Sequence, residues 1–388
     1  VRRAKRPPMG AASLSPTPDP TQPAEPRVWL VIGDKLGDNA QVRVLADALG
    51  WPYEVRQVLP KPEWVLGKPD FRSGLHHLDL ERSARLEPPW PDLILTIGRR
   101  PSMAALWVQD QSGGRTRIVL VGRPKRWAER FALIVAPSQF RIPPRANLVQ
   151  LDLPLMRADP AAVASAGEIW RSRLAHLPRP LIAVLIGGET KPFRFDAAVA
   201  RDLLHRLEAI RARDGGSFYL TTSRRTRPEV VEALAEGLPQ GAVLHRWSPD
   251  TGAENPYLGL LAHADRFVVT GDSVSMMVEV ASLGRPLAIF ALPVGSGLAD
   301  RARAALARLG GAGGLAHLLH RLGVAGYARD LGAIHRLLYE RGLAVPLGQP
   351  FRPAAGPLAD ELTPLARRIR GLLAADDAAV GLTRRGVR

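Results

Sequence analysis

The stretch VVTGDSVSMMVEVASLGRPLAIF, Val268–Phe290, decides the fold because it begins and ends as an apolar strand and has helical spacing in between. The run 267–270 predicts a buried strand that ends at Gly271, and the run 276–283 predicts a helix that ends before Gly284. Asp272 or Ser273 is expected to cap that helix. The order strand, turn, helix, strand is typical of a parallel α/β sheet.

The same order recurs along two halves of the chain. Residues 28–32 and 93–97 are predicted strands, each followed by a helix, and further strands are expected in TRIVLVGRP, FALIVAP and NLVQLDLPL. After Pro178 a second series begins with RPLIAVLIGGETKPFRFD and continues through GSFYLTTSRRTRPEVVEALAEGL and GAVLHRW. Apolar strands that alternate with helices indicate parallel sheets covered on both faces. We therefore expect an α/β protein with two Rossmann-like parallel-sheet domains that face each other across a cleft, and a helical C-terminal tail.

Composition sets the expected domain bounds. Residues 1–26 are rich in arginine and proline and predict a disordered leader. An N-terminal domain is expected over 27–177 and a C-terminal domain over 178–300, with the boundary at the prolines that end a predicted helix. Residues 301–388 are rich in alanine, arginine and leucine and predict a helical extension.

The charge is strongly positive, with a formal net charge of +16, and most basic residues are arginine. Such a charge attracts phosphates or acidic lipid headgroups, although biased base composition of the genome also produces it. No cysteine is present, so disulfide and thiol chemistry are excluded. No apolar run reaches the roughly 20 residues that span a bilayer. We expect a cytoplasmic protein, with contact to the inner face of the membrane as an open alternative.

The predicted helix start after Gly271 is the leading candidate site. Backbone N–H groups and the positive end of a helix dipole favour a phosphate beside Asp272, Ser273, Ser275 and Met276. Glu279 follows one turn later, where a carboxylate can accept hydrogen bonds from ribose hydroxyls. The alternative is a capped, structural helix start with a solvated Glu279.

Three further turns of the second half carry polar groups. Gly187 and Gly188 follow a strand and permit close approach to a ligand, with Lys191 available for a phosphate. The next turn offers hydroxyls and guanidinium groups for a diphosphate, at Thr222, Ser223 and Arg224. Asn255 is expected to cap a helix, and it is also a candidate for shaping the pocket of the base. Simple turns and an exposed basic loop remain the structural alternatives.

The first half places its candidates at the corresponding strand ends, 33–41, 98–102 and 122–126. Asp38 or Asp34 is a candidate general base, and Gly37 permits the approach of an acceptor, with Gln41 beside them. Asp38 is equally compatible with a helix cap or a favourable charge at a helix start. Arg99 and Arg100 are candidates for binding an anionic acceptor. The histidines have no recognisable metal-ligand spacing, and no P-loop is present, so neither a metal nor a cofactor is expected.

Six motifs occur in order over residues 28–300: GDKLGDNAQ, IGRR, IGGETK, LTTSRRT, ENPYLGLLAHAD and VTGDSVSMMVE. Together they resemble the mitochondrial fission (elongated-mitochondria) family, which has bacterial members. The predicted helix start Asp272-Ser-Val-Ser-Met276, with Glu279 and Gly284-Arg-Pro286, also resembles the nucleotide-sugar half of GT-B glycosyltransferases. The resemblance implies a GT-B-like, metal-independent architecture and a nucleotide-diphosphate sugar as donor substrate.

The chain departs from the expected family pattern at two places. The resemblance implies a histidine–aspartate pair where this chain has Pro137-Ser-Gln-Phe140, and a histidine–tyrosine pair where it has Pro192-Phe193. Both changes remove polar groups from the predicted rim. Three functions are therefore weighed: a glycosyltransferase-like protein that acts on an unknown acceptor, a non-catalytic scaffold that binds a membrane surface or a protein partner, and, as the weakest, a nucleic-acid binder.

Overall fold

The computed structural model describes residues 25–65, 67, 69–249, 254–295, 297 and 329–385. The predicted leader lies outside these residues except for its last two positions, and the predicted helices within 301–328 lie outside them as well.

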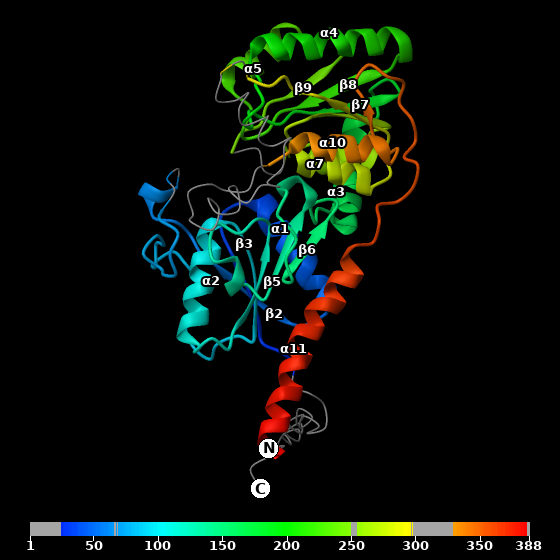
Figure 1. Ribbon diagram of the computed structural model, residues 1–388. Coiled ribbons are helices and arrows are strands. Elements are labelled where there is room, and N and C mark those ends of the chain that lie inside the picture. The colour runs from blue at the N-terminus through cyan, green and yellow to red at the C-terminus, as the bar shows by residue number, and fades with distance from the viewer. Residues whose placement is uncertain are drawn as a thin grey trace, which may run out of the picture.

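Two parallel sheets of six strands form the protein (Figure 1). The first has the order β2-β1-β3-β4-β5-β6 and the second the order β12-β11-β10-β7-β8-β9. The strands of the first sheet are β1 Val28–Ile32, β2 Tyr53–Gln57, β3 Leu93–Ile97, β4 Arg117–Val121, β5 Leu133–Pro137 and β6 Leu148–Leu151. Those of the second are β7 Leu181–Leu185, β8 Ser217–Thr221, β9 Val243–His245, β10 Arg266–Thr270, β11 Leu287–Phe290 and β12 Val345–Pro346. The predicted fold class is thus confirmed.

Helices connect and cover the strands. In the first domain these are α1 Leu36–Leu49 and α2 Arg99–Gln111, with the short η1 Pro62–Trp64, η2 Ala128–Arg130 and η3 Ser138–Phe140. In the rest of the chain they are α3 Pro160–Leu174, α4 Ala197–Asp214, α5 Pro228–Glu236, α6 Tyr257–His263, α7 Val274–Ser282, α10 Leu331–Glu340 and α11 Leu362–Arg385. Central strands such as β1, β3 and β7 are buried at every position, which explains their unbroken apolar runs.

The edge strand β2 was not predicted from the sequence. Its residues, YEVRQ, are exposed or half-exposed, because the strand pairs only with β1 and lies at the edge of the sheet. An edge strand with polar residues has no apolar run that distinguishes it from a loop. Strand β12 was not predicted either, because two residues are too few to show an apolar pattern.

The tail is shared between the two domains. Helix α10 packs its buried residues into the core of the second domain, and β12 extends that sheet. Helix α11 instead packs Leu365, Ala366 and Ile369 into the core of the first domain (Figure 1). Arg370 donates hydrogen bonds to the carbonyls of Ala48 and Leu49 at the end of α1, at 3.0 and 2.8 Å. The tail therefore ties the two domains together.

Two segments within the described residues connect the domains. Segment 152–159 leads from β6 to α3, and segment 347–361 leads from β12 back to α11. The Asp152 backbone N–H donates to Glu361 at 2.8 Å, so the two crossings touch each other. Arg341, after α10, pairs with Asp152. Across the domains, Arg141 pairs with Asp330 at 2.6 Å.

Helix α3 packs on the second domain, although it precedes the predicted boundary at residue 178. Its Trp170 belongs to the second domain's core, and it contacts α6 closely at Gly259. The predicted domain bounds remain predictions, and the packing of α3 favours a boundary before it.

The contact between α3 and α6 can be tested at Gly259. A Cβ added there would lie 2.3 Å from the Trp170 ring, so we expect Gly259→Ala to destabilise the protein by about 1–3 kcal/mol. Gly371→Ala is the matched control, because that glycine is exposed in α11 with nothing within 4 Å, and alanine there should stabilise by up to about 1 kcal/mol. Thermal unfolding of both variants measures the difference. Equal melting temperatures would contradict the close packing.

Candidate functional site

The carboxyl-terminal ends of both sheets converge on Arg329, the residue that precedes Asp330 and α10. Arg329 has as electrostatic neighbours Asp38 from the first domain and Asp272 from the second. Removal from water, with repulsion from Arg123 and Arg225, lowers the pKa of Arg329 to about 10. Positive charge is therefore concentrated between the two domains.

The turn after β7 is built around the buried Asp272. Gly188 N–H donates to Asp272 Oδ2 and the Thr270 hydroxyl donates to Oδ1, both at 2.8 Å. Gly187 N–H donates to Thr270 Oγ1, also at 2.8 Å. Burial raises the pKa of Asp272, and these hydrogen bonds oppose that rise. The carboxylate thus holds the ends of β7 and β10 together.

Both positions of this turn require glycine, because neighbouring groups lie close to the backbone there. A Cβ at Gly187 would lie 2.3 Å from Asp272 Oδ2, and one at Gly188 would lie 2.2 Å from the carbonyl oxygen of Arg225. The sequence predicted that the glycines permit close approach to a ligand. In the structure the groups that approach them belong to the protein itself.

The start of α7 is not capped by a side chain. Ser273 occupies the N-cap position without a capping hydrogen bond, and Asp272 is turned toward Gly188. The predicted capping by Asp272 or Ser273 is therefore wrong, because the carboxylate is used by the neighbouring turn. Ser275 and Met276 are half-buried in the first turn of α7. The helix start retains the character of an anion site.

Glu279 is partly buried and accepts a hydrogen bond from the Tyr257 hydroxyl. Burial raises the pKa of Glu279, and the Tyr257 bond opposes that rise. Burial together with Glu279 raises the pKa of Tyr257 well above its usual value. The alternative of a solvated Glu279 is therefore wrong. Asn255 accepts from the Tyr257 backbone N–H at 3.0 Å, but the N-cap position of α6 belongs to Pro256, so the predicted cap at Asn255 is wrong by one residue.

This environment predicts how Glu279→Gln changes the pH dependence of stability. Because the folded-state pKa of Glu279 is raised, the group binds more protons folded than unfolded, and its contribution to stability falls as pH rises above the ordinary value of 4.5. Glutamine does not titrate, so the variant does not lose stability through this group as pH rises. We expect melting temperatures measured between pH 4 and pH 8 to fall less with rising pH in the variant. A parallel pair of pH profiles would contradict the burial of this carboxylate.

The loop after β8 places Arg225, not its neighbour, at the site. Arg225 donates to the Thr190 hydroxyl at 2.9 Å and lies 3.5 Å from Asp272 Oδ2. Arg224 and Arg225 are both exposed, so their contacts and not their burial distinguish them. Thr222 accepts from the Trp247 backbone N–H at 2.8 Å and so secures the neighbouring segment. The Ser223 backbone N–H donates to Thr226 within the turn at 2.9 Å.

In the first domain, Asp38 stands at the edge of the site. It is half-buried in the first turn of α1, and a Cβ at Gly98 would lie 3.9 Å from its Oδ2. Burial raises the pKa of Asp38, although Lys35, Arg329 and Lys125 act in the opposite direction. The N-cap position belongs to Lys35, so the alternative of Asp38 as a cap is wrong. A favourable charge in the first helical turn remains compatible with its place.

The other predicted residues lie around this centre to different degrees. Asp34 and Gly37 are exposed, Gln41 is half-buried on α1, and Lys191 is exposed after the glycine turn. Arg100 is engaged by a loop, because its guanidinium donates to the carbonyls of Trp64, Val65 and Gly67. Arg99 similarly donates to the Pro69 carbonyl at 3.1 Å. Both arginines therefore hold the 62–71 loop.

Sequence reasoning missed Gln139, which connects the two domains, and His335, which packs within the second domain. Gln139 accepts from Arg329 at 3.2 Å through its side chain, and from the Asp330 backbone N–H at 2.8 Å through its carbonyl. His335 of α10 contacts the Gly271 carbonyl at 2.7 Å and stacks on Phe193 at 6.3 Å. These are the positions of the two departures from the family pattern, and here they have structural partners. No local motif marks Arg329 or His335 in the sequence.

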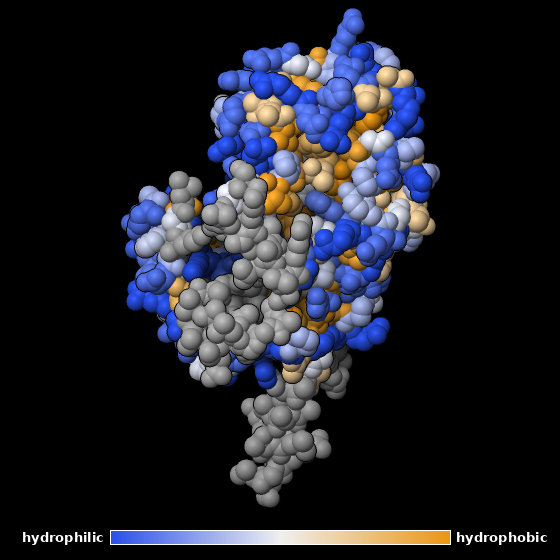
Figure 2. All heavy atoms as spheres, turned by 45° about the horizontal axis from the view of Figure 1, so that its top comes forward, coloured by the Kyte–Doolittle hydropathy of each residue, from blue (hydrophilic) through white to orange (hydrophobic). Residues whose placement is uncertain are grey.

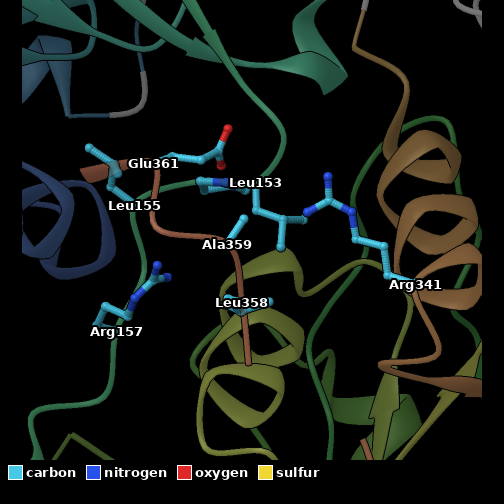
Figure 3. A pocket seen from close by; sticks show the side chains of 8 residues that line it. Leu153, Leu155, Arg157, Arg341, Leu358, Ala359 and Glu361 are labelled. Carbon is cyan, nitrogen blue, oxygen red and sulfur yellow. The ribbon is translucent and has the colours of Figure 1, made fainter. Parts of the chain in front are cut away.

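A small hollow lies apart from this centre, where the two crossing segments meet. Figure 3 shows Leu153, Arg157 and Arg341 around it, with Glu361 alongside. Its volume of about 10 Å³ is at the lower limit for holding one water molecule, and it is far too small for a nucleotide. Figure 2 shows mainly hydrophilic residues on the visible face, with hydrophobic ones in patches between them.

Within 25–65, 69–249, 254–295 and 329–385, no group of three or more histidine, aspartate or glutamate side chains could hold a metal ion. No helix there has the length and apolar character to cross a membrane.

Comparison with known sequences identifies the family. Residues 37–322 match the family described as mitochondrial fission ELM1. The chain belongs to the mitochondrial fission ELM1 family. The resemblance drawn from the six motifs is therefore confirmed.

Two ELM1 relatives illustrate the range of similarity. The mitochondrial fission protein ELM1 of Arabidopsis thaliana is 28% identical over 224 residues, which cover 52% of each chain. The present chain thus spans about half the length of that relative. An uncharacterized protein of Rickettsia prowazekii is 24% identical over 301 residues, covering 69% of this chain and 83% of that protein.

Solved structures are similar only at a low level. The UDP-GlcNAc 2-epimerase of Methanocaldococcus jannaschii is 10% identical with a TM-score of 0.45, covering 89% of this chain and 99% of that one. A ugt transferase from Siraitia grosvenorii in complex with UDP is 12% identical with a TM-score of 0.39, covering 93% and 96%. Similarity this low assigns no ligand to the ELM1-family chain.

Proposed function

We propose that this ELM1-family chain binds a nucleotide-diphosphate sugar between its two domains and transfers the sugar to an acceptor hydroxyl. The observation that carries the proposal is the convergence of Arg225 and Arg329 beside the uncapped start of α7. A diphosphate there would gain charge-assisted hydrogen bonds and would offset the repulsion between the arginines.

Each part of the donor has a corresponding group. The diphosphate lies at the start of α7, near Ser273, Ser275 and Arg225. Glu279, held by Tyr257, accepts hydrogen bonds from the ribose. No metal is needed in this scheme, because guanidinium groups and the helix dipole stabilise the departing diphosphate.

The transfer step assigns Asp38 as general base. The acceptor oxygen forms a bond to the anomeric carbon while the bond from that carbon to the phosphate oxygen breaks. The leaving nucleoside diphosphate takes the electron pair, and the acceptor proton goes to Asp38. The raised pKa of Asp38 makes it a stronger base than an exposed aspartate.

Binding of the donor is tested first by calorimetry with UDP, GDP, ADP, CDP and TDP and their common sugars. Because charged hydrogen bonds contribute about 1.5–3 kcal/mol each, Arg225→Ala should lower the affinity for the nucleotide that binds best about 10- to 100-fold. Glu279→Ala should also lower this affinity. Arg224→Ala is the matched control, since it removes the same charge from the adjacent exposed position. Equal effects of Arg224→Ala and Arg225→Ala would contradict the assigned site.

A non-catalytic scaffold on the same fold is the second candidate. It is favoured by Gln139 and Phe193, which stand where the family resemblance implies polar pairs and which have structural partners here. Such a protein would bind the nucleotide without turnover and would present the complex to a membrane surface or a protein partner.

Asp38→Asn separates the two candidates. With the donor selected above and a cell-envelope extract as the source of acceptors, a transferase should release nucleoside diphosphate, and the variant should lower that rate about 10²- to 10⁴-fold. Its affinity for the diphosphate should stay nearly the same. Binding without any release by the unmodified chain would favour the scaffold.

A further inference from the structure

The loop after β4 carries a group of cations that the donor site does not use. Its sequence is Gly122-Arg-Pro-Lys-Arg-Trp127, so three of its six residues are cationic. Lys125 is an electrostatic neighbour of Asp38, and Arg329 is another. The loop therefore borders the assigned general base on the side of the first domain.

The geometry of the loop is unusual at Trp127. This residue has φ of 50°, in the left-handed region that bulky side chains rarely adopt. Its ring packs on Phe71 at 5.8 Å between centroids, and the guanidinium of Arg126 lies 5.1 Å from its centroid. Arg99 in turn lies 5.8 Å from the Phe71 ring. Aromatic packing thus holds the loop in its strained conformation.

The first cation of the loop, Arg123, extends the positive region toward the donor site. Its guanidinium lies 5.6 Å from the Phe140 ring, and that of Arg329 lies 5.8 Å from the same ring. Arg123 and Arg329 therefore share one aromatic side chain as a platform. Positive charge therefore extends from the loop after β4 to the junction of the two domains, where Asp38 and Asp272 lie beside it.

We propose that the loop 122–127 binds a phosphate monoester on the acceptor, next to the hydroxyl that Asp38 deprotonates. The proposal rests on the proposed function, since it names the class of acceptor. Lys125 and Arg126 contact the phosphate, and Trp127 packs against the adjoining part of the acceptor. Arg225 serves the donor diphosphate on the other side of Arg329.

The source of the phosphate is a free sugar or polyol phosphate or a lipid headgroup, and two probes distinguish them. Glycerol 3-phosphate represents the free form. Phosphatidylcholine vesicles with and without phosphatidic acid represent the lipid form. Calorimetry and vesicle co-sedimentation on the full chain measure the two.

Two sets of substitutions with opposite expected effects test the proposed acceptor site. We expect Lys125→Gln/Arg126→Gln to lower the affinity for the phosphate-monoester probe at least about tenfold and the affinity for the diphosphate less than about twofold. Arg225→Ala should lower the diphosphate affinity at least about tenfold and the monoester affinity less than about twofold. Arg82→Gln/Arg85→Gln is the control, because it removes two exposed charges from the same domain.

Each outcome decides one of the two proposals. Loss of monoester binding only in the Lys125/Arg126 variant supports the acceptor site, even if no nucleotide binds and the proposed function fails. The acceptor site is overturned if the unmodified chain binds neither probe. It is also overturned if the control variant loses as much monoester affinity as the Lys125/Arg126 variant, or if only Arg225→Ala abolishes monoester binding. None of these outcomes decides the donor site, which has its own test.

Discussion

The buried carboxylate of Asp272 is the interaction on which the arrangement of the site depends. It accepts hydrogen bonds from Gly188 N–H and from Thr270, which join two neighbouring strands of the second sheet at their carboxyl ends. An anion in such a place is unfavourable unless several donors satisfy it. The chain meets this condition with two glycines that let the backbone approach closely. Arg225 lies beside the same carboxylate and so is held near the start of α7.

Much of the fold was predictable from the sequence because burial leaves a simple pattern. Strands covered on both faces, such as Leu93–Ile97, must be apolar at every position, and they were predicted with the observed bounds. Edge strand Tyr53–Gln57 has no such requirement and was missed. The pairing of α3 with the second domain was also hidden, since an amphipathic helix does not specify which domain covers its apolar face.

The candidate site was predictable only in part, for a different reason. Turns at strand ends can be located from the sequence, but the direction of a side chain in a turn cannot. Arg224 and Arg225 are adjacent and chemically identical, and only the folded turn shows that Arg225 points to Asp272. Arg329 lies far along the chain from every motif, so its position between the domains depends on tertiary structure alone.

The two crossing segments have a mechanical consequence. Because Asp152 N–H is hydrogen-bonded to Glu361, the two connections between the domains that the structure describes pass through one place and act as a single pivot. Rotation about a pivot displaces each atom in proportion to its distance from it, so residues near Asp152 move least. The Arg141–Asp330 pair joins the domains at the opposite end of α10 from Arg341, and Gln139 adds hydrogen bonds to Arg329 and Asp330 there. Two domains thus meet at one pivot, and the contacts of Arg141 and Gln139 with the start of α10 restrain their rotation about it.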